Sequence, residues 1–517
     1  MSSLRLIHGF SITYKKERGF DMSRKSFRNL IAYEIYPTSF RDSNADGIGD
    51  LRGITEKLDY VHNMGFNAIW LNPFYVSPFR DGGYDVKDFF DVDPRFGTLR
   101  DFQQLCRNAH EKGIKILVDL VAGHASSDNR DFLESARPEK NEKSDLFIWN
   151  DNIWNLEPGL RLISGMHQRN GCYLVNFFAH QPAFNYGFKR IDYPSWQMSY
   201  KDERTLKARN YLLEVMRFWL GKGADGFRVD MADSLVKNDD DKKATCEVWR
   251  WMFRRIRKEY PDAFFVSEWS NPKQAFDAGF DADFVLDHWD NYYHRLFRSN
   301  YSTRGKALIK GGGDIRFALK DMRERFEEAF RQKRQLALIS GNHDTWRIAN
   351  YLNEEELRTF YLMLFTLPGV PFILYGDEIG MKTADLPSKD GGFQRTGTRI
   401  PMIWNDSEPC HGFSQTADET YLPFNPDNKV SAEAAMADDN SLYSFIRKLI
   451  ELRKKNRDLS DPAMEIIEKD RIVTFTRGKY RLIVNMSEHE FPFEGKVVFS
   501  SGDYGNTLPA GAAVLVR

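Results

Sequence analysis

Eight short apolar runs, most of them followed by a segment whose apolar residues have helical spacing, set the strongest limit on how this chain folds. Short apolar runs are typical of parallel strands buried on both faces. Their alternation with helices predicts a parallel α/β fold, and eight such units favour a closed barrel over an open sheet. The predicted strands are Ile31–Tyr36, Asn67–Leu71, Ile114–Asp119, Gly226–Asp230, Ala263–Glu268, Phe284–Asp287, Leu336–Ser340 and Val370–Tyr375.

Two stretches depart from this pattern and divide the chain into domains. After the third predicted strand, residues 125–190 are polar and irregular, and the stretch is longer than an ordinary βα loop. We interpret it as an inserted subdomain B. Past a last barrel helix at Ser441–Asn456, short alternating runs predict a C-terminal antiparallel β domain over 457–517. The (β/α)₈ TIM barrel is then expected to comprise 1–124 and 191–456.

The composition is that of an ordinary globular protein, with 517 residues, 42% hydrophobic residues and a net charge of −1. The dispersed Lys and Arg residues predict no nucleic-acid partner. Neither a signal peptide nor an apolar stretch of the ~20 residues that span a membrane is present, so we expect no membrane association. Four distant cysteines without metal-ligand spacing suggest reduced thiols and a cytoplasmic protein.

Three carboxylates end or follow predicted strands, at the edge where a (β/α)₈ barrel builds its active site. Asp230 and Glu268 end adjacent strands, and Asp344 follows the seventh. Glycosidic cleavage needs one carboxylic acid to protonate the leaving oxygen and one carboxylate to attack the sugar or activate water. Adjacent strands can bring two carboxyl groups within about 5 Å, the spacing of retaining enzymes. The sequence therefore predicts a retaining glycoside hydrolase.

Arg228 stands two residues before Asp230 and hence on the same face of its strand. A guanidinium there would keep Asp230 ionised, as a nucleophile requires. Each carboxylate taken alone could instead cap the helix that follows its strand. Three of them together, with His343 beside Asp344, favour a catalytic site.

Four ordered strings, the insertion and the β domain resemble the α-amylase family, glycoside hydrolase family 13, over nearly the whole chain. The strings read Asp119-Leu-Val-Ala-Gly-His124, Gly226-Phe-Arg-Val-Asp230, Phe265-Val-Ser-Glu-Trp269 and Ser340-Gly-Asn-His-Asp344. The resemblance implies that Asp230 is the nucleophile, Glu268 the general acid and base, and Asp344 the transition-state stabiliser. It also implies that His124 and His343 bind the sugar and that Arg228 supports Asp230.

A loop near the start of the barrel predicts a calcium site. Its oxygen-bearing side chains alternate around a Gly turn, as in calcium loops. In the oligo-1,6-glucosidases, which this opening resembles, such a loop binds Ca²⁺ with one backbone carbonyl. An Asx-rich turn without a metal is the alternative. The predicted ligands are Asp42, Asn44, Asp46, Asp50 and the carbonyl of Ile48.

Two further segments resemble the parts of the family that bind the terminal sugar. In Asp81-Gly-Gly-Tyr84, the family's Tyr stacks on glucose and its Asp binds glucose hydroxyls in exo-acting members. Gly391 to Trp404 resembles the segment whose Arg, matched here to Arg399, does the same. Arg399 and Asp81 closing on one sugar would make a dead-end pocket, whereas each alone could form a surface ion pair.

The chain also departs from the family. Gly123 stands where an Asn that often binds calcium precedes the histidine, so the amylase-type calcium site is expected to be absent. Met231 follows the nucleophile where Val, Thr or Ala relates to linkage preference, so linkage is not predicted. Asp233 and Ser234 replace the Lys and His common in endo-acting amylases.

These features predict an α-glucosidase that removes glucose units from the non-reducing end of short oligosaccharides or disaccharides. Two alternatives stay open. A transglycosylase or a sucrose or maltose isomerase would share the fold and replace water by a sugar acceptor. A non-catalytic barrel that binds a protein partner would typically lose the carboxylates and carry a membrane anchor.

Overall fold

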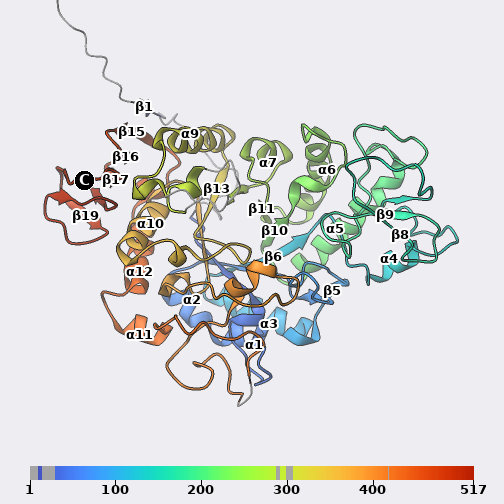
Figure 1. Ribbon diagram of the computed structural model, residues 1–517, viewed down its shortest axis with the longest axis horizontal. Coiled ribbons are helices and arrows are strands. Elements are labelled where there is room, and N and C mark those ends of the chain that lie inside the picture. Colours follow the sequence, from blue (N-terminus) through green and yellow to red (C-terminus); the bar gives the residue numbers. More distant parts are fainter. Residues whose placement is uncertain (1–9, 14–28, 287–291, 299–306, 417–418) are drawn as a thin grey trace, which may run out of the picture.

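The computed structural model describes residues 10–13, 29–286, 292–298, 307–416 and 419–517. Its centre is the predicted closed barrel of eight parallel strands, flanked by a sheet domain on one side and subdomain B on the other (Figure 1). The end of the sixth predicted strand, Asp287, lies outside the described residues. The barrel strands are β2 Ala32–Ile35, β3 Ala68–Leu71, β6 Lys115–Val121, β10 Gly226–Asp230, β11 Phe264–Ser267, β12 Ala282–Val285, β13 Gln335–Ile339 and β14 Val370–Leu374.

Every barrel strand is almost wholly buried, which explains why its sequence is apolar rather than alternating. Inside the barrel, Trp70, Phe284 and Phe372 belong to one apolar cluster, in which Phe372 packs edge to face against both other rings. This cluster closes the barrel below the strand ends. The polar side chains that follow the strands therefore face a cavity with a solid floor.

Helices surround the barrel and begin at local capping signals. Thr98 and Asp101 form a reciprocal capping box at the start of α3, as Asn353 and Glu356 do at α10. The helices outside subdomain B are α1 Leu51–Glu56, α2 Leu58–Met64, α3 Leu99–Glu111, α5 Leu206–Lys222, α6 Lys243–Glu259, α7 Pro272–Ala278, α8 Tyr292–Arg295, α9 Ile315–Gln332, α10 Glu354–Thr366, α11 Ala432–Ala437, α12 Leu442–Lys455 and α13 Arg457–Ser460. None of the helices described is long and apolar enough to cross a membrane.

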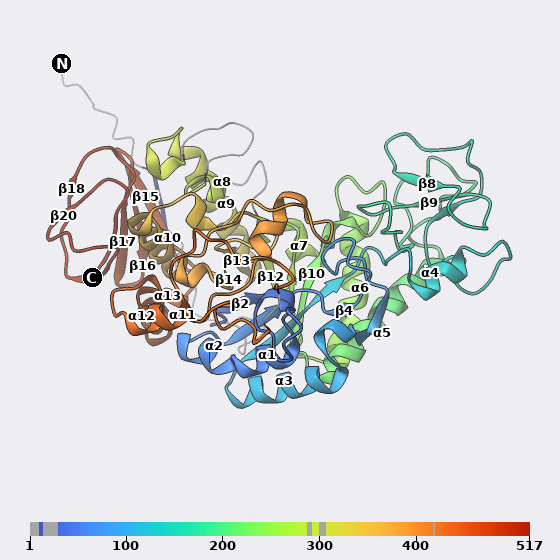
Figure 2. The same ribbon diagram turned by 60° about the horizontal axis from the view of Figure 1, so that its bottom comes forward.

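The stretch after β6 forms a separate lobe beside the barrel (Figure 2). It contains α4 Arg130–Ser135 and a small sheet of β7 Trp149–Asn150, β9 Cys172–Leu174 and β8 Leu162–Ser164. Its own apolar cluster includes Ile148, Leu174 and Phe188, with Trp196 packed against it. A second small antiparallel pair, β4 Tyr75–Val76 and β5 Asp88–Val92, lies in the loop after β3.

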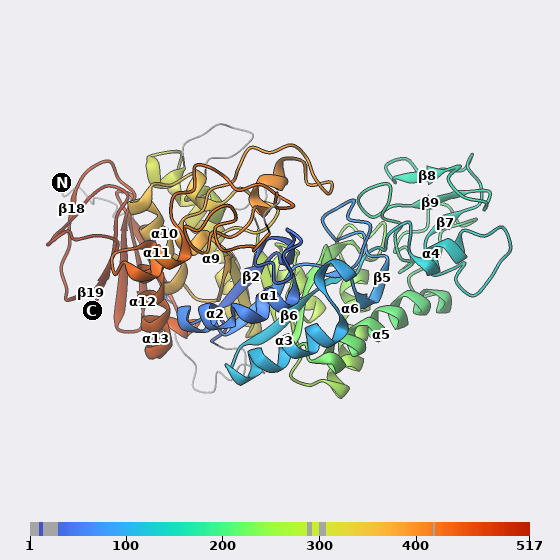
Figure 3. The same ribbon diagram turned by 90° about the horizontal axis from the view of Figure 1, so that it is seen from below.

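The C-terminal domain is an antiparallel sheet at the opposite end of the molecule (Figure 3). One of its strands was not predicted. β1 Phe10–Thr13 pairs with β15, so this segment belongs to the C-terminal sheet and not to the barrel as its place in 1–124 implied. The sheet order is β1, β15 Glu465–Lys469, β16 Ile472–Arg477, β17 Tyr480–Asn485, β21 Ala513–Val516 and β19 Val497–Ser500, beside the pair β18 Phe491–Pro492 and β20 Thr507–Leu508.

Candidate active site

The predicted catalytic side chains meet at the carboxyl ends of the barrel strands. Asp230 ends β10, Glu268 directly follows β11, and Asp344 lies in the loop after β13. They line a cavity of about 420 Å³ that also receives side chains from subdomain B and from the loop after β14. The remaining lining residues are Asp81, Tyr84, His124, Phe177, Gln181, Met231, Asp233, Trp269, Leu286 and Arg395.

One buried guanidinium joins three carboxylates at the floor of this cavity. Arg228 Nη1 lies 2.8 Å from Asp119 Oδ1 and 3.0 Å from Asp230 Oδ1, and its Nη2 lies 2.7 Å from Glu268 Oε1. Burial raises the pKa of Asp230, the charge of Glu268 raises it further, and Arg228 opposes both. One guanidinium is therefore the counter-charge for three carboxylates, and Asp230 lies beside Glu268 and Asp119 with only that positive charge in contact.

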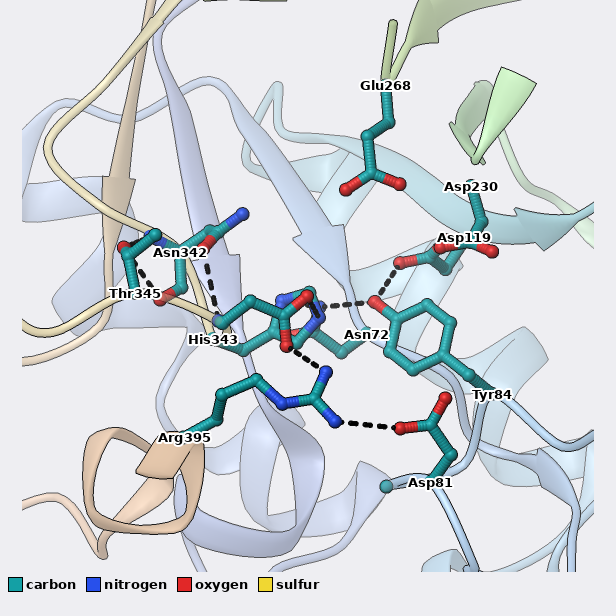
Figure 4. Close-up of polar contacts among 12 residues, drawn as sticks. Asn72, Asp81, Tyr84, Asp119, Asp230, Glu268, Asn342, His343, Thr345 and Arg395 are labelled. Carbon is teal, nitrogen blue, oxygen red and sulfur yellow. Dashed lines mark hydrogen bonds and ion pairs between the residues drawn. The ribbon is translucent and has the colours of Figure 1, made fainter. Parts of the chain in front are cut away.

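Asp119 is a site residue that the sequence analysis did not select. It is fully buried, and its Oδ2 accepts a hydrogen bond from the Tyr84 hydroxyl at 2.8 Å (Figure 4). The Trp70 indole donates to the same oxygen at 3.1 Å. Burial raises its pKa to about 6, against the opposing effect of Arg228. A charged residue within an otherwise apolar strand was the available signal, because such a residue is rarely buried without partners.

The residue after Asp230 turns the chain toward the second carboxylate. Met231 has the left-handed conformation φ 40°, ψ 47°, which a non-glycine residue adopts only under constraint. Its N–H donates to Glu268 Oε2 at 2.9 Å. Glu268 is therefore held by Arg228 through one oxygen and by the Met231 backbone through the other.

Asp344 is in contact with two guanidinium groups and one imidazole. Arg399 Nη2 lies 2.8 Å and Arg395 Nη1 3.0 Å from Asp344 Oδ1, and His343 Nε2 lies 3.4 Å from Oδ2. Burial alone would raise the pKa of Asp344, but His343 and the two arginines lower it well below its ordinary value. Asp344 is therefore an anion in the folded protein.

The structure pairs Asp81 with Arg395 rather than with Arg399. Arg395 Nη2 lies 3.0 Å from Asp81 Oδ1 (Figure 4), and Gln181 donates to the other oxygen at 2.8 Å. Arg399 instead contacts Asp344 and donates from Nε to the carbonyl of His343 at 3.1 Å. Both arginines lie in the short helix η9 Phe393–Arg399, so sequence matching alone did not separate them. Arg395 is the residue missed, and the binding of the terminal sugar by Asp81 and Arg399 stays a prediction.

His124 lies at the junction with subdomain B, where a missing side chain makes room for an amide. A Cβ on Gly123 would lie 2.5 Å from Asn176 Nδ2. That Nδ2 lies 3.2 Å from His124 Nδ1, while His124 Nε2 lies 3.1 Å from the Tyr84 carbonyl. Burial lowers the pKa of His124 to about 3, so the ring is neutral. The Lys237 ammonium donates to Asn176 Oδ1 at 2.8 Å and ties the lobe to the loop after β10.

The Asp42–Asp50 loop satisfies its carboxylates with its own hydrogen bonds. Asp42 accepts three N–H groups of the loop and the Ser414 hydroxyl, which occupies both of its oxygens. Asp50 accepts the N–H and hydroxyl of Ser43 and caps α1. Nowhere in the described part of the chain do three His, Cys, Asp or Glu side chains come together as metal ligands. The donor types suit Ca²⁺, but this arrangement does not form a cage for it, and the calcium site stays a prediction.

Comparison with known proteins identifies the family of this chain. The family model described as alpha amylase, catalytic domain, matches residues 34–461. The chain belongs to the α-amylase family. Alpha-amylase 3 of Dictyoglomus thermophilum is 32% identical over 456 residues, which cover 86% of this chain and 80% of that protein. The oligo-1,6-glucosidase of Parageobacillus thermoglucosidasius is 30% identical and covers 90% of this chain and 91% of its own length.

Solved structures of this family share the architecture. An isomaltulose synthase of Erwinia rhapontici superposes with a TM-score of 0.78 at 21% identity, over 96% of this chain and 99% of that one. This likeness supports the predicted barrel with its C-terminal β domain. As an α-amylase family member with its carboxylates in place, the chain is a glycoside hydrolase by fold and site, and not the non-catalytic barrel considered above.

Proposed function

We propose that this protein is a retaining α-glucosidase that releases single glucose units from the non-reducing end of short α-glucosides. The observation that carries the proposal is the pair of carboxylates on one guanidinium: Asp230 and Glu268 bind Arg228 through different nitrogens. One protonated and one ionised carboxyl are what the first step of a retaining reaction requires. The resemblance assigns the proton to Glu268 and the nucleophile to Asp230.

The reaction follows two displacements. Glu268 donates its proton to the glycosidic oxygen while Asp230 Oδ attacks the anomeric carbon, so the bond to the leaving sugar breaks and a β-glycosyl ester forms. Glu268, now a carboxylate, takes a proton from water, whose oxygen displaces Asp230 and restores the α-configuration. Asp344 is held as an anion by Arg395, Arg399 and His343, and it stabilises the positive charge that develops on the sugar ring in the transition state.

Exo action is supported by the ion pair at the far side of the cavity from the leaving group. Arg395 joins Asp81 to Asp344, and none of these three contacts Glu268, beside which the leaving sugar must lie. Charged groups in that place hydrogen-bond the hydroxyls of a terminal sugar and leave no path for a longer chain. Short substrates are favoured for the same reason.

Three finer points belong to the proposal. The Asp42–Asp50 loop is proposed to bind one structural Ca²⁺, for which Asp42 would exchange some of its hydrogen bonds for the metal. A cytoplasmic location is proposed because all four cysteines are free and buried. Transglycosylation or isomerisation is the alternative outcome. An acceptor sugar would then bind against the apolar side chains that line the cavity beside Glu268, namely Met231, Trp269 and Leu286.

A substrate panel followed by NMR of the first products tests the proposal. Maltose, isomaltose, sucrose and trehalose are each incubated with the purified protein. α-Glucose as the first product from at least one of them is the expected result. A β-configured product contradicts retention, and new disaccharides in place of glucose favour the transferase alternative.

A further inference from the structure

A buried carboxyl group lies beneath the active site without touching its cavity. Glu34 belongs to β2, and the residue is 1% exposed. Its Oε1 lies 2.7 Å from His343 Nδ1, 3.2 Å from Asn72 Nδ2 and 3.3 Å from the His343 backbone nitrogen. Its Oε2 has no hydrogen-bond partner among the residues described. A carboxylate in this position would leave a charged oxygen buried and unsatisfied, which is costly.

The neighbouring imidazole ring of His343 stacks against two tyrosine rings, and its two nitrogens lie at its edges. Tyr84 stacks on one side of the His343 ring with centroids 5.2 Å apart, and Tyr36 stacks at 6.4 Å, both at 11°. One edge presents Nδ1 to Glu34. The other presents Nε2 to Asp344 Oδ2 at 3.4 Å and has no hydrogen-bond partner in the described chain. The ring therefore connects Glu34 to the sugar cavity.

The surrounding donors determine where the proton on this ring lies. The Tyr84 hydroxyl donates to Asp119 at 2.8 Å, so it accepts from Asn72 Nδ2 at 3.3 Å. The same amide nitrogen lies 2.9 Å from His343 Nδ1. An amide nitrogen only donates, and its contact with Nδ1 is the shortest of its three contacts with Nδ1, Glu34 and Tyr84, which favours Nδ1 as an acceptor and the ring proton on Nε2. The 2.7 Å contact between Nδ1 and Glu34 Oε1 then requires a proton on Glu34.

We propose that Glu34 is a positioning residue, a neutral carboxylic acid that holds His343 in the Nε2–H tautomer and thereby aims an N–H donor at Asp344 and the bound sugar. The tautomer of a histidine is set by the hydrogen bond that its other nitrogen makes. Burial raises the pKa of Glu34 well above its ordinary value, against the opposing effects of the Asn72 hydrogen bond and Arg228. The other charged groups that act on the His343 ring are Asp344, Arg399, Arg228 and Arg395.

The opposite assignment produces two repulsive contacts. If Glu34 were ionised beside a neutral ring, the proton would be on Nδ1. That N–H would then face the amide N–H of Asn72 at 2.9 Å, and the Nε2 lone pair would face the Asp344 carboxylate at 3.4 Å. The neutral acid removes both contacts and keeps the donor toward the cavity.

The tautomer can be read directly by NMR of protein labelled with ¹⁵N-histidine, with His343 assigned by comparison with the His343→Gln variant. We expect a proton-free Nδ1 and a protonated Nε2 in the wild type and in Glu34→Gln, whose amide can donate to Nδ1 as the acid does. Glu378→Gln is the matched control. Glu378 is also fully buried and accepts the Tyr33 and Tyr60 hydroxyls at 2.7 Å, and this change should leave the His343 signals unaltered.

Activity supplies the second readout. Glu34→Gln should retain kcat/KM within about threefold, whereas Glu34→Leu should lose about 10- to 100-fold, by analogy with the loss when a partner that orients a metal-binding histidine is removed. A protonated Nδ1 in the wild type, or wild-type activity in Glu34→Leu, overturns the proposal. If Glu34→Leu does not fold, the wild-type spectrum and Glu34→Gln decide. The inference rests on the proposed function only in naming a sugar as the group that receives the Nε2–H hydrogen bond. Absence of any glucosidase activity refutes that function, whereas the NMR spectrum tests the tautomer independently.

Discussion

The ion pair between Asp81 and Arg395 is the feature whose removal tests exo action most sharply. Asp81 Oδ1 lies 3.0 Å from Arg395 Nη2, and the same guanidinium lies 3.0 Å from Asp344. Asp81→Ala leaves Arg395 bound to Asp344 alone and deprives the terminal sugar of one partner. Arg395→Ala leaves Asp81 without its guanidinium partner, while Asp344 keeps Arg399. The double variant removes the pair altogether.

The expected magnitude follows from burial and distance. Removing one partner of a buried, hydrogen-bonded charge pair costs about 2–5 kcal/mol. The Asp81 side chain is 8% exposed and that of Arg395 is 24% exposed, so partial screening by solvent places this pair in the lower half of the range. A loss of about 2–3 kcal/mol corresponds to roughly 30- to 150-fold in kcat/KM, at about 1.4 kcal/mol per tenfold. The two single losses should add to more than the loss of the double variant, because they share one interaction.

The assay is kcat/KM for release of glucose from maltose and from isomaltose, with amylose viscosity measured alongside. The wild type should release glucose without a rapid loss of amylose viscosity. Arg399→Lys is a useful comparison, because Arg399 contacts Asp344 but not Asp81. Additive single losses, full activity of Asp81→Ala, or rapid thinning of amylose by the wild type would each show that the pair does not close the cavity.

Three further outcomes are expected. Asp230→Asn should fold normally and retain less than about a hundredth of the wild-type kcat, since loss of a nucleophile costs several orders of magnitude; a higher residual rate contradicts its assignment. His124 has its pKa lowered from 6.5 to about 3, so below its ordinary pKa the unfolded chain binds a proton that the folded protein does not. The free energy of unfolding should therefore fall as pH drops from 6.5 toward 3, by up to about 1.4 kcal/mol per pH unit from this group. Measured by urea unfolding at several pH values, the free energy of unfolding of His124→Asn should depend less steeply on pH than that of the wild type. If the Asp42–Asp50 loop binds Ca²⁺, chelation should lower the melting temperature of the wild type but not of an Asp46→Ala variant; equal melting of the wild type with and without chelator, and no bound metal, would show that hydrogen bonds alone hold this loop.

Much of the fold could be read from local patterns. The eight barrel strands overlap the apolar runs that predicted them, because strands buried on both faces carry a continuous apolar signal, although β12 begins at Ala282 and not at the predicted Phe284. Capping residues marked the starts of the helices in the same local way, as Ser441 does for α12. The places of Asp230, Glu268 and Asp344 at the strand ends followed directly, since a parallel barrel brings all its carboxyl ends to one rim. These features depend on residues close together in the chain.

Only the tertiary structure decided the partners. Arg395 and Arg399 are four residues apart, and the choice between them for Asp81 depends on how the loop after β14 lies against the loop after β3. The filling of the space beside Gly123 by Asn176, the burial of Asp119 under Arg228, and the pairing of β1 with β15 join segments distant in sequence. A sequence determines which side chains are available at each element's end, but contacts between distant segments are chosen by packing and by the need to pair every buried charge.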